Sequence, residues 1–337
     1  MMEYNNITVK KIQALLRTPK QSLENEFSPY FCRYYVRYGH PKKFDGYLRF
    51  CQHLLSITKA RDARVLDLGC GFGLLSILLS LEGAREVIGY DLNTEKISLF
   101  KKFIGYLGEE IQNVKPLLGD SVKIDFPGQT FDVVIANEVF SHIRDCDTSL
   151  QEVFRILKPG GRFLVRDGNN SLFLPGRMKR RRFWKRIERG PVETHWFRST
   201  DIPLSYVEIR KKMIMDQFPQ LDYRIIEWLS KETAGMYGNE IIDAVKKFEN
   251  NGKTIHKQKF PYRNPMTGEY PEREINPFIF KKNLKKLGFK VSFVPYFYSG
   301  DFNNFEMAVK TFFFWIEKYL PIAHLFLNPG FAILGTK

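Results

Sequence analysis

The chain has 337 residues, enough for one large domain with insertions or for two smaller domains. Its 44% hydrophobic and 26% charged residues are the proportions of an ordinary globular protein, which excludes a disordered or fibrous chain. The net charge of +15 indicates either a solvated basic face or a surface that attracts anions. The four scattered cysteines argue against a disulfide framework or a metal site and favour a reducing, cytoplasmic compartment.

Residues 1–59 are rich in aromatic side chains, above all in "SPYFCRYYVRYGHPKKFDGYLRF". We expect them to form an amino-terminal helical cap in which the aromatic rings belong to the core. The first residues, "MMEYNNITVKK", lack the apolar region of a signal peptide, and we expect none.

Residues 60–168 alternate short apolar runs with helical patterns. Such alternation predicts an α/β fold, a doubly wound and mostly parallel sheet with helices on both faces, which binds ligands at the carboxyl ends of its strands. The predicted strands are 64–68, 86–93, 114–120, 131–140 and 162–168, the predicted helices are 73–83, 94–110 and 147–157, and "KPGG" at 158–161 is a predicted turn.

Residues 169–286 form a long insertion after the fifth predicted strand, and we expect a mainly helical substrate or lid region. Two further strand-like runs, 289–297 and 330–337, lie within residues 287–337. Between them, "TFFFWIEKYLPIAHLFLNPGFAIL" is apolar but is interrupted by Glu317, Lys318 and two prolines, so no transmembrane span is predicted. Peripheral membrane contact stays open.

The charge is unevenly distributed. Residues 60–168 hold 13 Lys or Arg and 16 Asp or Glu, so the basic excess lies outside them. It is densest in "RMKRRRFWKRIER" at 177–189, which has eight basic residues against one acid. This segment is either a solvated helical face or a surface that attracts an anion.

Three alternating glycines lie where the first predicted strand meets its helix, in "VLDLGCGFGLLSILLS" at 65–80. Glycine there lets a nucleotide-like ligand approach the backbone closely. The dinucleotide fingerprint needs a glycine at the position of Leu74, whereas Asp67 and the glycines here form D-x-G-x-G-x-G. This pattern resembles motif I of the class I S-adenosylmethionine-dependent methyltransferases.

The later segments support the resemblance. Asp91 ends the second predicted strand, where an acid can accept hydrogen bonds from ribose hydroxyls. "LLGDS", "FDVVIANEVFSHI" and "RILKPGGRFLV" are similar to the family's third to fifth strand segments. The resemblance implies a seven-stranded sheet completed by residues 287–337, with the last strand antiparallel. It also implies S-adenosylmethionine as the cofactor, bound by Asp67, Gly69, Cys70, Gly71, Gly73, Asp91, Leu92, Asp120, Ser121 and Asn137.

The methyl group of a sulfonium is already activated, so such an enzyme needs a general base only for an alcohol or a protonated amine. The candidate catalytic residues are His142, Glu138 and His195, with Asp167 as a further acid near a strand end. Each also has a structural interpretation: Glu138 as a ligand of the methionine part, His142 as a helix-start residue, and His195 as a packing partner of Trp196. No metal is expected.

Several sequence motifs that would indicate a particular methyl acceptor are missing. The segment "NEVF" lacks the N-P-P-Y type motif used on planar amines, no cysteine follows a proline, and no RNA-binding module is recognisable. We therefore expect methyl transfer to the O or N atom of a small molecule, which the basic segment would allow to be anionic. The alternatives are an RNA methyltransferase that grips phosphates with residues 177–189 and stacks bases on Phe183 and Trp184, and a non-catalytic cofactor-binding module that regulates a partner.

Overall fold

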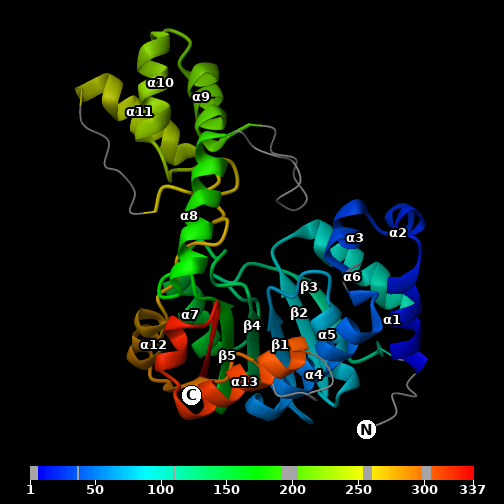
Figure 1. Cartoon of the computed structure of the whole chain (residues 1–337). Helices are drawn as coiled ribbons and strands as arrows, with labels where there is room; N and C mark the ends of the chain where they lie inside the picture. Colours follow the sequence, from blue (N-terminus) through cyan, green and yellow to red (C-terminus); the bar gives the residue numbers. More distant parts are fainter. Residues whose placement is uncertain (1–6, 36–37, 109–110, 191–203, 253–259, 298–304) are drawn as a thin grey trace. The chain divides into compact units, whose positions relative to one another are not determined.

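A computed structural model describes residues 7–35, 38–108, 111–190, 204–252, 260–297 and 305–337 (Figure 1). Seven strands form one sheet in the order β3-β2-β1-β4-β5-β7-β6. The strands are β1 (Arg64–Leu68), β2 (Glu86–Asp91), β3 (Val114–Leu118), β4 (Phe131–Asn137), β5 (Leu157–Gly168), β6 (Lys290–Val294) and β7 (Gly330–Thr336). The predicted α/β fold with a seven-stranded sheet is therefore confirmed.

The pairing of the strands fixes where a ligand can bind. β1 pairs in parallel with β2 on one side and with β4 on the other, while β7 pairs antiparallel with β6, as the sequence predicts for the last strand. The strand order therefore reverses between β1 and β4. In sheets of this kind the crevice outside the carboxyl ends of such a strand pair is the usual ligand site.

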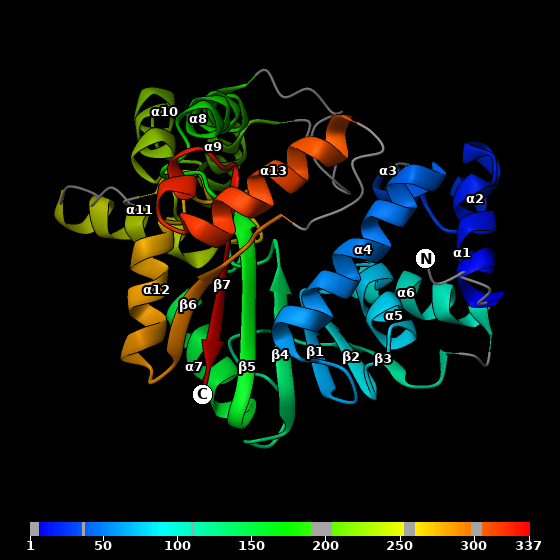
Figure 2. The same ribbon diagram turned by 60° about the horizontal axis from the view of Figure 1, so that its bottom comes forward.

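Helices cover both faces of this sheet (Figure 2), so its central strands are nearly continuous apolar runs. The helices α5 (Leu74–Leu81) and α6 (Thr94–Leu107) share one core with strand residues such as Val65. On the other face, Asn283 of α12 (Pro277–Lys286) donates to Asp147 of α7 (Cys146–Ile156) over 3.4 Å. The right-handed crossovers of parallel strands account for this division.

The amino-terminal helices pack beside the start of α5. They are α1 (Ile7–Arg17), α2 (Lys20–Glu26), α3 (Pro29–Tyr35) and α4 (Pro41–Thr58). Phe31 and Tyr35 are buried, and both rings make edge contacts with Phe72. The Tyr35 hydroxyl accepts a hydrogen bond from the backbone N–H of Leu74 over 3.1 Å, which satisfies one donor at the start of α5.

The predicted turn at 158–161 is wrong in detail, because β5 already begins at Leu157. The register to β4 shifts from Phe131↔Leu157 to Val133↔Arg162, so "KPGG" is an irregularity inside a longer strand. Gly160 has a φ of +76° there, and its N–H donates to the carbonyl of Lys337 over 2.9 Å. The backbone pairing of Gly160 with Lys337 thus keeps residues 158–161 in the strand, although their sequence favours a turn.

Residues 141–144 and 168–276 form a second compact unit, here called the insertion unit, while the remainder forms the sheet unit. The insertion unit contains α8 (Leu174–Arg189), α9 (Tyr206–Gln217), α10 (Tyr223–Glu232) and α11 (Asn239–Asn251), so the predicted insertion is mainly helical. Ile214, Leu229 and Ile241 lie in a core of its own. The sequence placed residues 277–286 in the insertion, but they form α12, which packs on β6 and β7 of the sheet unit.

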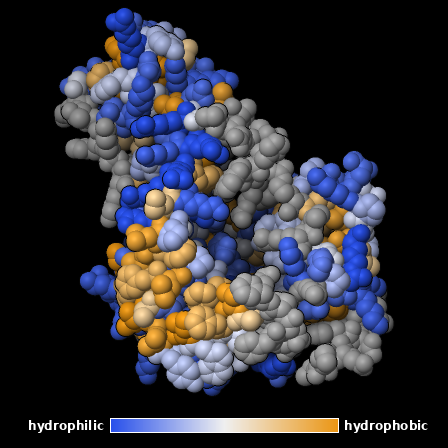
Figure 3. Space-filling view, viewed as in Figure 1, coloured by the Kyte–Doolittle hydropathy of each residue, from blue (hydrophilic) through white to orange (hydrophobic). Residues whose placement is uncertain are grey.

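The late apolar segment forms α13 (Phe305–Tyr319) and the short 3₁₀ helix η3 (Ala323–Phe326). Figure 3 shows apolar surface gathered over these two elements, which Figure 1 draws in orange to red. None of the helices in the described part of the chain has the length and apolar character needed to cross a membrane.

Candidate active site

The three glycines form the turn between β1 and α5, and all three have left-handed backbone angles. Their φ values are +72° at Gly69, +59° at Gly71 and +84° at Gly73, a region that side chains with a Cβ atom rarely adopt. Gly73 is also the residue that caps α5. The N–H of Gly69 donates to the carbonyl of Tyr90 over 2.7 Å, which ties the turn to the end of β2.

What approaches the backbone differs from one glycine to the next. A Cβ atom on Gly69 would lie 2.5 Å from a methyl group of Val139, and one on Gly73 would overlap the ring of Phe100. A Cβ atom on Gly71 would meet nothing within 4 Å in the described part of the chain. Gly69 and Gly73 therefore make room for the protein's own side chains, and only Gly71 leaves open space above the turn.

Two carboxylates support the turn. Asp67 is buried and accepts a hydrogen bond from the Ser76 hydroxyl over 2.6 Å. Burial raises the pKa of Asp67 to about 7, against the effect of the Ser76 hydrogen bond and together with the charge of Asp91. Asp91 accepts from the N–H of Gly71 through Oδ2 and from the N–H of Asn93 through Oδ1, each over 2.9 Å. Asp91 thus holds the backbone of the glycine turn, and Asp67 holds the Ser76 side chain of α5.

The other predicted cofactor residues of β1 to β3 lie at the same edge. Leu92 follows β2 with 56% of its surface exposed, although it is apolar. Asp120 follows β3 and accepts from the N–H of Val122 over 3.1 Å, and the Ser121 and Ser149 hydroxyls lie 2.9 Å apart. The thiol of Cys70 lies 3.7 Å from the Gly71 carbonyl, and burial raises its pKa well above the ordinary value, so it is not a nucleophile at neutral pH.

Asn137 and Glu138 end β4 and contact the end of β5. Asn137 accepts a hydrogen bond through its amide oxygen from the guanidinium of Arg166, and the N–H of Glu138 donates to the Arg166 carbonyl over 2.7 Å. Glu138 has a φ of +58°, which is strained for a residue with a side chain. Its exposed carboxylate accepts from the Tyr296 hydroxyl over 3.2 Å.

Arg166 and Tyr296 are site residues that the sequence analysis missed. Arg166 is buried, donates to the Tyr296 carbonyl over 2.8 Å, and lies between the rings of Phe50 and Tyr296 at 4.5 and 4.1 Å. The available signal was a single arginine near the end of the apolar run "RFLVRDG". A charge is buried at such a position only where partners compensate it.

The remaining predicted catalytic residues do not all belong to the same unit. His142 belongs to the insertion unit, where Nδ1 lies 2.9 Å from the carbonyl of Tyr270 and 3.4 Å from the N–H of Glu272. Asp167 is buried in the sheet unit. His195 lies outside the described residues.

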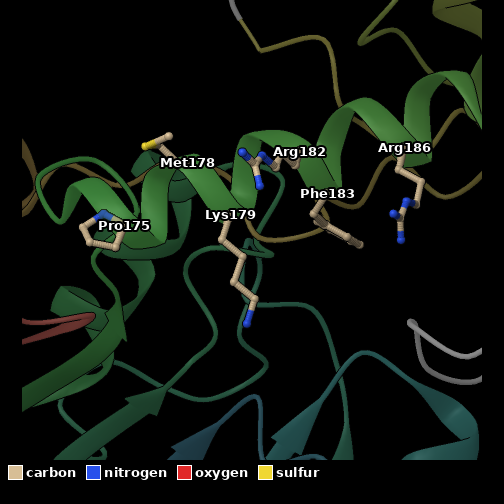
Figure 4. Close-up of a pocket in the computed structure, with 6 residues that line it drawn as sticks. All are labelled: Pro175, Met178, Lys179, Arg182, Phe183 and Arg186. Carbon is tan, nitrogen blue, oxygen red and sulfur yellow. The ribbon is translucent and has the colours of Figure 1, made fainter.

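The basic segment forms most of α8. A hollow of about 400 Å³ lies along this helix, and Figure 4 shows Lys179, Phe183 and Arg186 pointing to the same side. Three cations and three apolar side chains line it: Lys179, Arg182, Arg186, Pro175, Met178 and Phe183.

Part of α8 serves the structure of the insertion unit itself. Arg177 pairs with Glu274 at 3.3 Å, and Arg180 pairs with Glu272. Trp184 is only 2% exposed, stacks on Tyr262, and donates through Nε1 to the carbonyl of Pro271 over 3.1 Å. The expectation that Trp184 is available to stack on a base is therefore wrong, because this ring belongs to the core.

The part of the chain that contains the glycine turn matches a known sequence family. Residues 59–217 match the sequence family of the methyltransferase domain. This match and the S-adenosylmethionine-dependent relatives support a class I methyltransferase domain over residues 59–217, with S-adenosylmethionine as its cofactor.

Curated relatives match about a third of the chain. It is 32% identical over 139 residues to a sterol 24-C-methyltransferase from Eremothecium gossypii, covering 40% of this chain and 36% of that protein. It is 33% identical over 111 residues to a ubiquinone biosynthesis O-methyltransferase from Colwellia psychrerythraea, covering 33% and 44%. The chain thus spans less than half the length of these relatives. A solved methyltransferase from Mesorhizobium loti aligns over 87% of this chain and 99% of its own with 14% identity and a TM-score of 0.44.

Proposed function

We propose that the sheet unit holds S-adenosylmethionine along the carboxyl ends of β1 to β4, and that the open space at Gly71 receives it. The observation that carries this assignment is that no atom of the described residues lies within 4 Å of a Cβ at Gly71. Asp91 would accept from the ribose hydroxyls, the exposed Leu92 would cover an adenine face, and Asp120 with Ser121 would meet its amino group. Asp67, Gly69, Cys70, Gly73 and Asn137 shape or border this space.

Bound there, the cofactor supplies a methyl group on a positively charged sulfur. The protein then has to align the acceptor and exclude water, and it needs a base only where the acceptor carries a proton. Glu138 suits this role, because its carboxylate is exposed at the end of β4 and is oriented by Tyr296. His142 is the second candidate: in the tautomer that donates from Nδ1 to the Tyr270 carbonyl, its basic lone pair is on Nε2.

The two bases can be separated by kinetics. If Glu138 takes the proton, Glu138→Gln lowers kcat and His142→Gln does not, while both variants keep the cofactor affinity of the native protein. The reverse result assigns the proton to His142. Equal loss of cofactor affinity and of activity in Glu138→Gln would instead make Glu138 a cofactor ligand. His195 stays a prediction for the insertion.

We further propose that the acceptor is a small molecule with an O or N nucleophile and an anionic group, recognised by the insertion unit. The support is the hollow on α8, where three cations border the apolar side chains of Met178 and Phe183. Such a lining suits a molecule with both an apolar body and a negative charge.

The same helix offers a matched control for this proposal. Lys179→Glu/Arg182→Glu reverses two charges in the hollow, and Arg181→Glu/Lys185→Glu reverses two exposed charges that do not line it. We expect only the first variant to lower kcat/KM for the acceptor, with the deficit shrinking as salt screens the charges, while both bind S-adenosylhomocysteine normally. Equal effects of the two variants would reduce the segment to a charged face.

The RNA alternative is less well supported, because Trp184 is buried and two of the arginines are paired within the insertion unit. Cell extract incubated with S-adenosylmethionine that carries a labelled methyl group distinguishes the two acceptors. We expect the label in the low-molecular-weight or solvent-extractable fraction, unaffected by ribonuclease. Label that ribonuclease releases from macromolecules would contradict the proposal.

A further inference from the structure

The exposed apolar side chains of the chain are concentrated at one place. Of the 22 large hydrophobic residues that are exposed in the described part of the chain, eight fall between residues 309 and 327. We call these eight the apolar face: Val309, Phe312, Trp315, Tyr319, Leu320, Ile322, Phe326 and Leu327. Concentrated apolar surface of this kind marks an interaction site, whereas single exposed residues are normal.

α13 is amphipathic in a way that explains this face. Val309, Phe312, Trp315 and Tyr319 follow one another at helical spacing and are 36 to 68% exposed. Thr311 and Glu317 of the same helix are buried, each 2% exposed. Glu317 accepts from the N–H of Phe297 over 2.9 Å and also from Asn328, so α13 is fixed to the sheet unit by its inner side.

The composition of the face matches a membrane interface. Trp315 and Tyr319 stack with their ring centres 5.7 Å apart, and the Lys318 ammonium lies 4.9 Å from the Trp315 ring. Tryptophan and tyrosine with a neighbouring lysine are the residues that favour the headgroup region, because one end is apolar and the other is polar. Leu320, Ile322, Phe326 and Leu327 add aliphatic and aromatic surface that could enter the acyl chains.

The charge around the face favours an anionic bilayer over a second copy of the chain. Within residues 309–327, which carry the face, Lys310 and Lys318 stand against a single acid, the buried Glu317. A second copy would bring the same positive charge against itself, whereas an anionic lipid surface complements it.

The face lies at the edge of the sheet where the active site is proposed. α13 runs beside the end of β6 (Figure 2). Phe297, whose N–H bonds Glu317 of α13, follows the carboxyl end of β6, and its neighbour Tyr296 bonds both Glu138 and Arg166. A bilayer against α13 would therefore lie near the ends of β4 and β5.

We propose that α13 and the residues through Leu327 form a docking surface for an anionic lipid bilayer, on which the enzyme lies peripherally. Vesicle binding needs neither cofactor nor acceptor, so this proposal and the proposed function can fail separately.

Vesicle flotation tests it, with phosphatidylcholine alone and with about 30 mol% phosphatidylglycerol added. We expect the native protein to bind the anionic vesicles and Phe312→Gln/Trp315→Gln/Tyr319→Gln to bind roughly tenfold or more weakly. Lys318→Glu should weaken binding to anionic vesicles alone. The matched control, Met215→Gln/Ile225→Gln/Met266→Gln, removes three exposed apolar side chains of the insertion unit and should bind like the native protein.

Circular dichroism and thermal unfolding verify that each variant is folded, independently of cofactor binding. Failure of the native protein to bind either vesicle would overturn the proposal, as would equal binding by the triple variant. A native dimer that the triple variant converts to a monomer, without lipid binding, would make this face an interface between two copies and would overturn it as well.

Discussion

The contrast between Gly71 and Gly73 gives a sharp test of the cofactor site. Both residues have a positive φ, so alanine at either position costs about 1–2 kcal/mol in backbone strain. At Gly73 the new methyl group also overlaps the buried Phe100 ring, which adds about 1–3 kcal/mol of overpacking. At Gly71 it enters open space, and strain is the only expected cost to folding.

The variant with the smaller expected loss of stability, Gly71→Ala, is the one expected to lose cofactor affinity. Gly71→Ala should lower the affinity for S-adenosylhomocysteine by about tenfold or more, which corresponds to about 1.4 kcal/mol, because the methyl group occupies the space assigned to the ligand. Gly160→Ala is the matched control: its φ of +76° and its open surroundings are alike, but it lies in the irregular part of β5.

Urea unfolding without ligand and calorimetric titration measure the two quantities separately. We expect Gly71→Ala and Gly160→Ala to lose similar stability, Gly73→Ala to lose more, and only Gly71→Ala among the two open positions to lose affinity. Native affinity in Gly71→Ala, with the same loss of stability as in Gly160→Ala, would refute the assignment of the open space to the cofactor.

Three further predictions concern charges and strain. Burial raises the pKa of Asp67 from 3.8 to about 7, so the folded protein holds this proton more tightly than the unfolded chain. The free energy of unfolding should therefore fall by at most about 4 kcal/mol as the pH rises from 4 to 7. Asp67→Asn should remove this pH dependence, and an unchanged pH slope in urea titrations of the variant would contradict the prediction. Glu138→Gly should be about 1 kcal/mol more stable than Glu138→Ala, since only glycine relieves the positive φ, and equal urea midpoints would argue against strain there. Arg210 is buried and pairs with Glu188, so Glu188→Ala should lower the free energy of unfolding by about 3–5 kcal/mol, because it leaves a buried charge unpaired. Glu188→Leu/Arg210→Met removes both charges and should lower it less. A double variant no more stable than Glu188→Ala would show that the unpaired charge does not cause the loss of stability.

The sheet unit could be predicted from the sequence because its signals are local. Each strand of residues 60–168 is an apolar run of a length that a buried strand needs, and the D-x-G-x-G-x-G pattern fixes the turn between β1 and α5. The acids Asp91 and Asp120 could be placed at the same edge because the carboxyl ends of parallel strands meet there.

Long-range packing accounts for what the sequence did not reveal. Val139 and Phe100 fill the space at Gly69 and Gly73, but both are distant from these glycines in the sequence. The sequence analysis therefore interpreted all three glycines as ligand contacts. The partner of His142, the carbonyl of Tyr270, lies in the insertion and carries no motif. The burial of Trp184 was hidden for the same reason, because its partners Tyr262 and Pro271 become neighbours only in the folded insertion unit.

Arg166 shows how such a hidden contact bears on the chemistry. A buried guanidinium needs compensation, and here it comes from an amide oxygen, a carbonyl oxygen and two ring faces. These partners hold the ends of β4 and β5 together without neutralising the charge. Glu138, whose N–H bonds the Arg166 carbonyl, is kept at a positive φ and presents its carboxylate to Tyr296. Strain that the surrounding contacts maintain at a strand end is typical of functional positions, which is why Glu138 is the residue of this edge most worth substituting first.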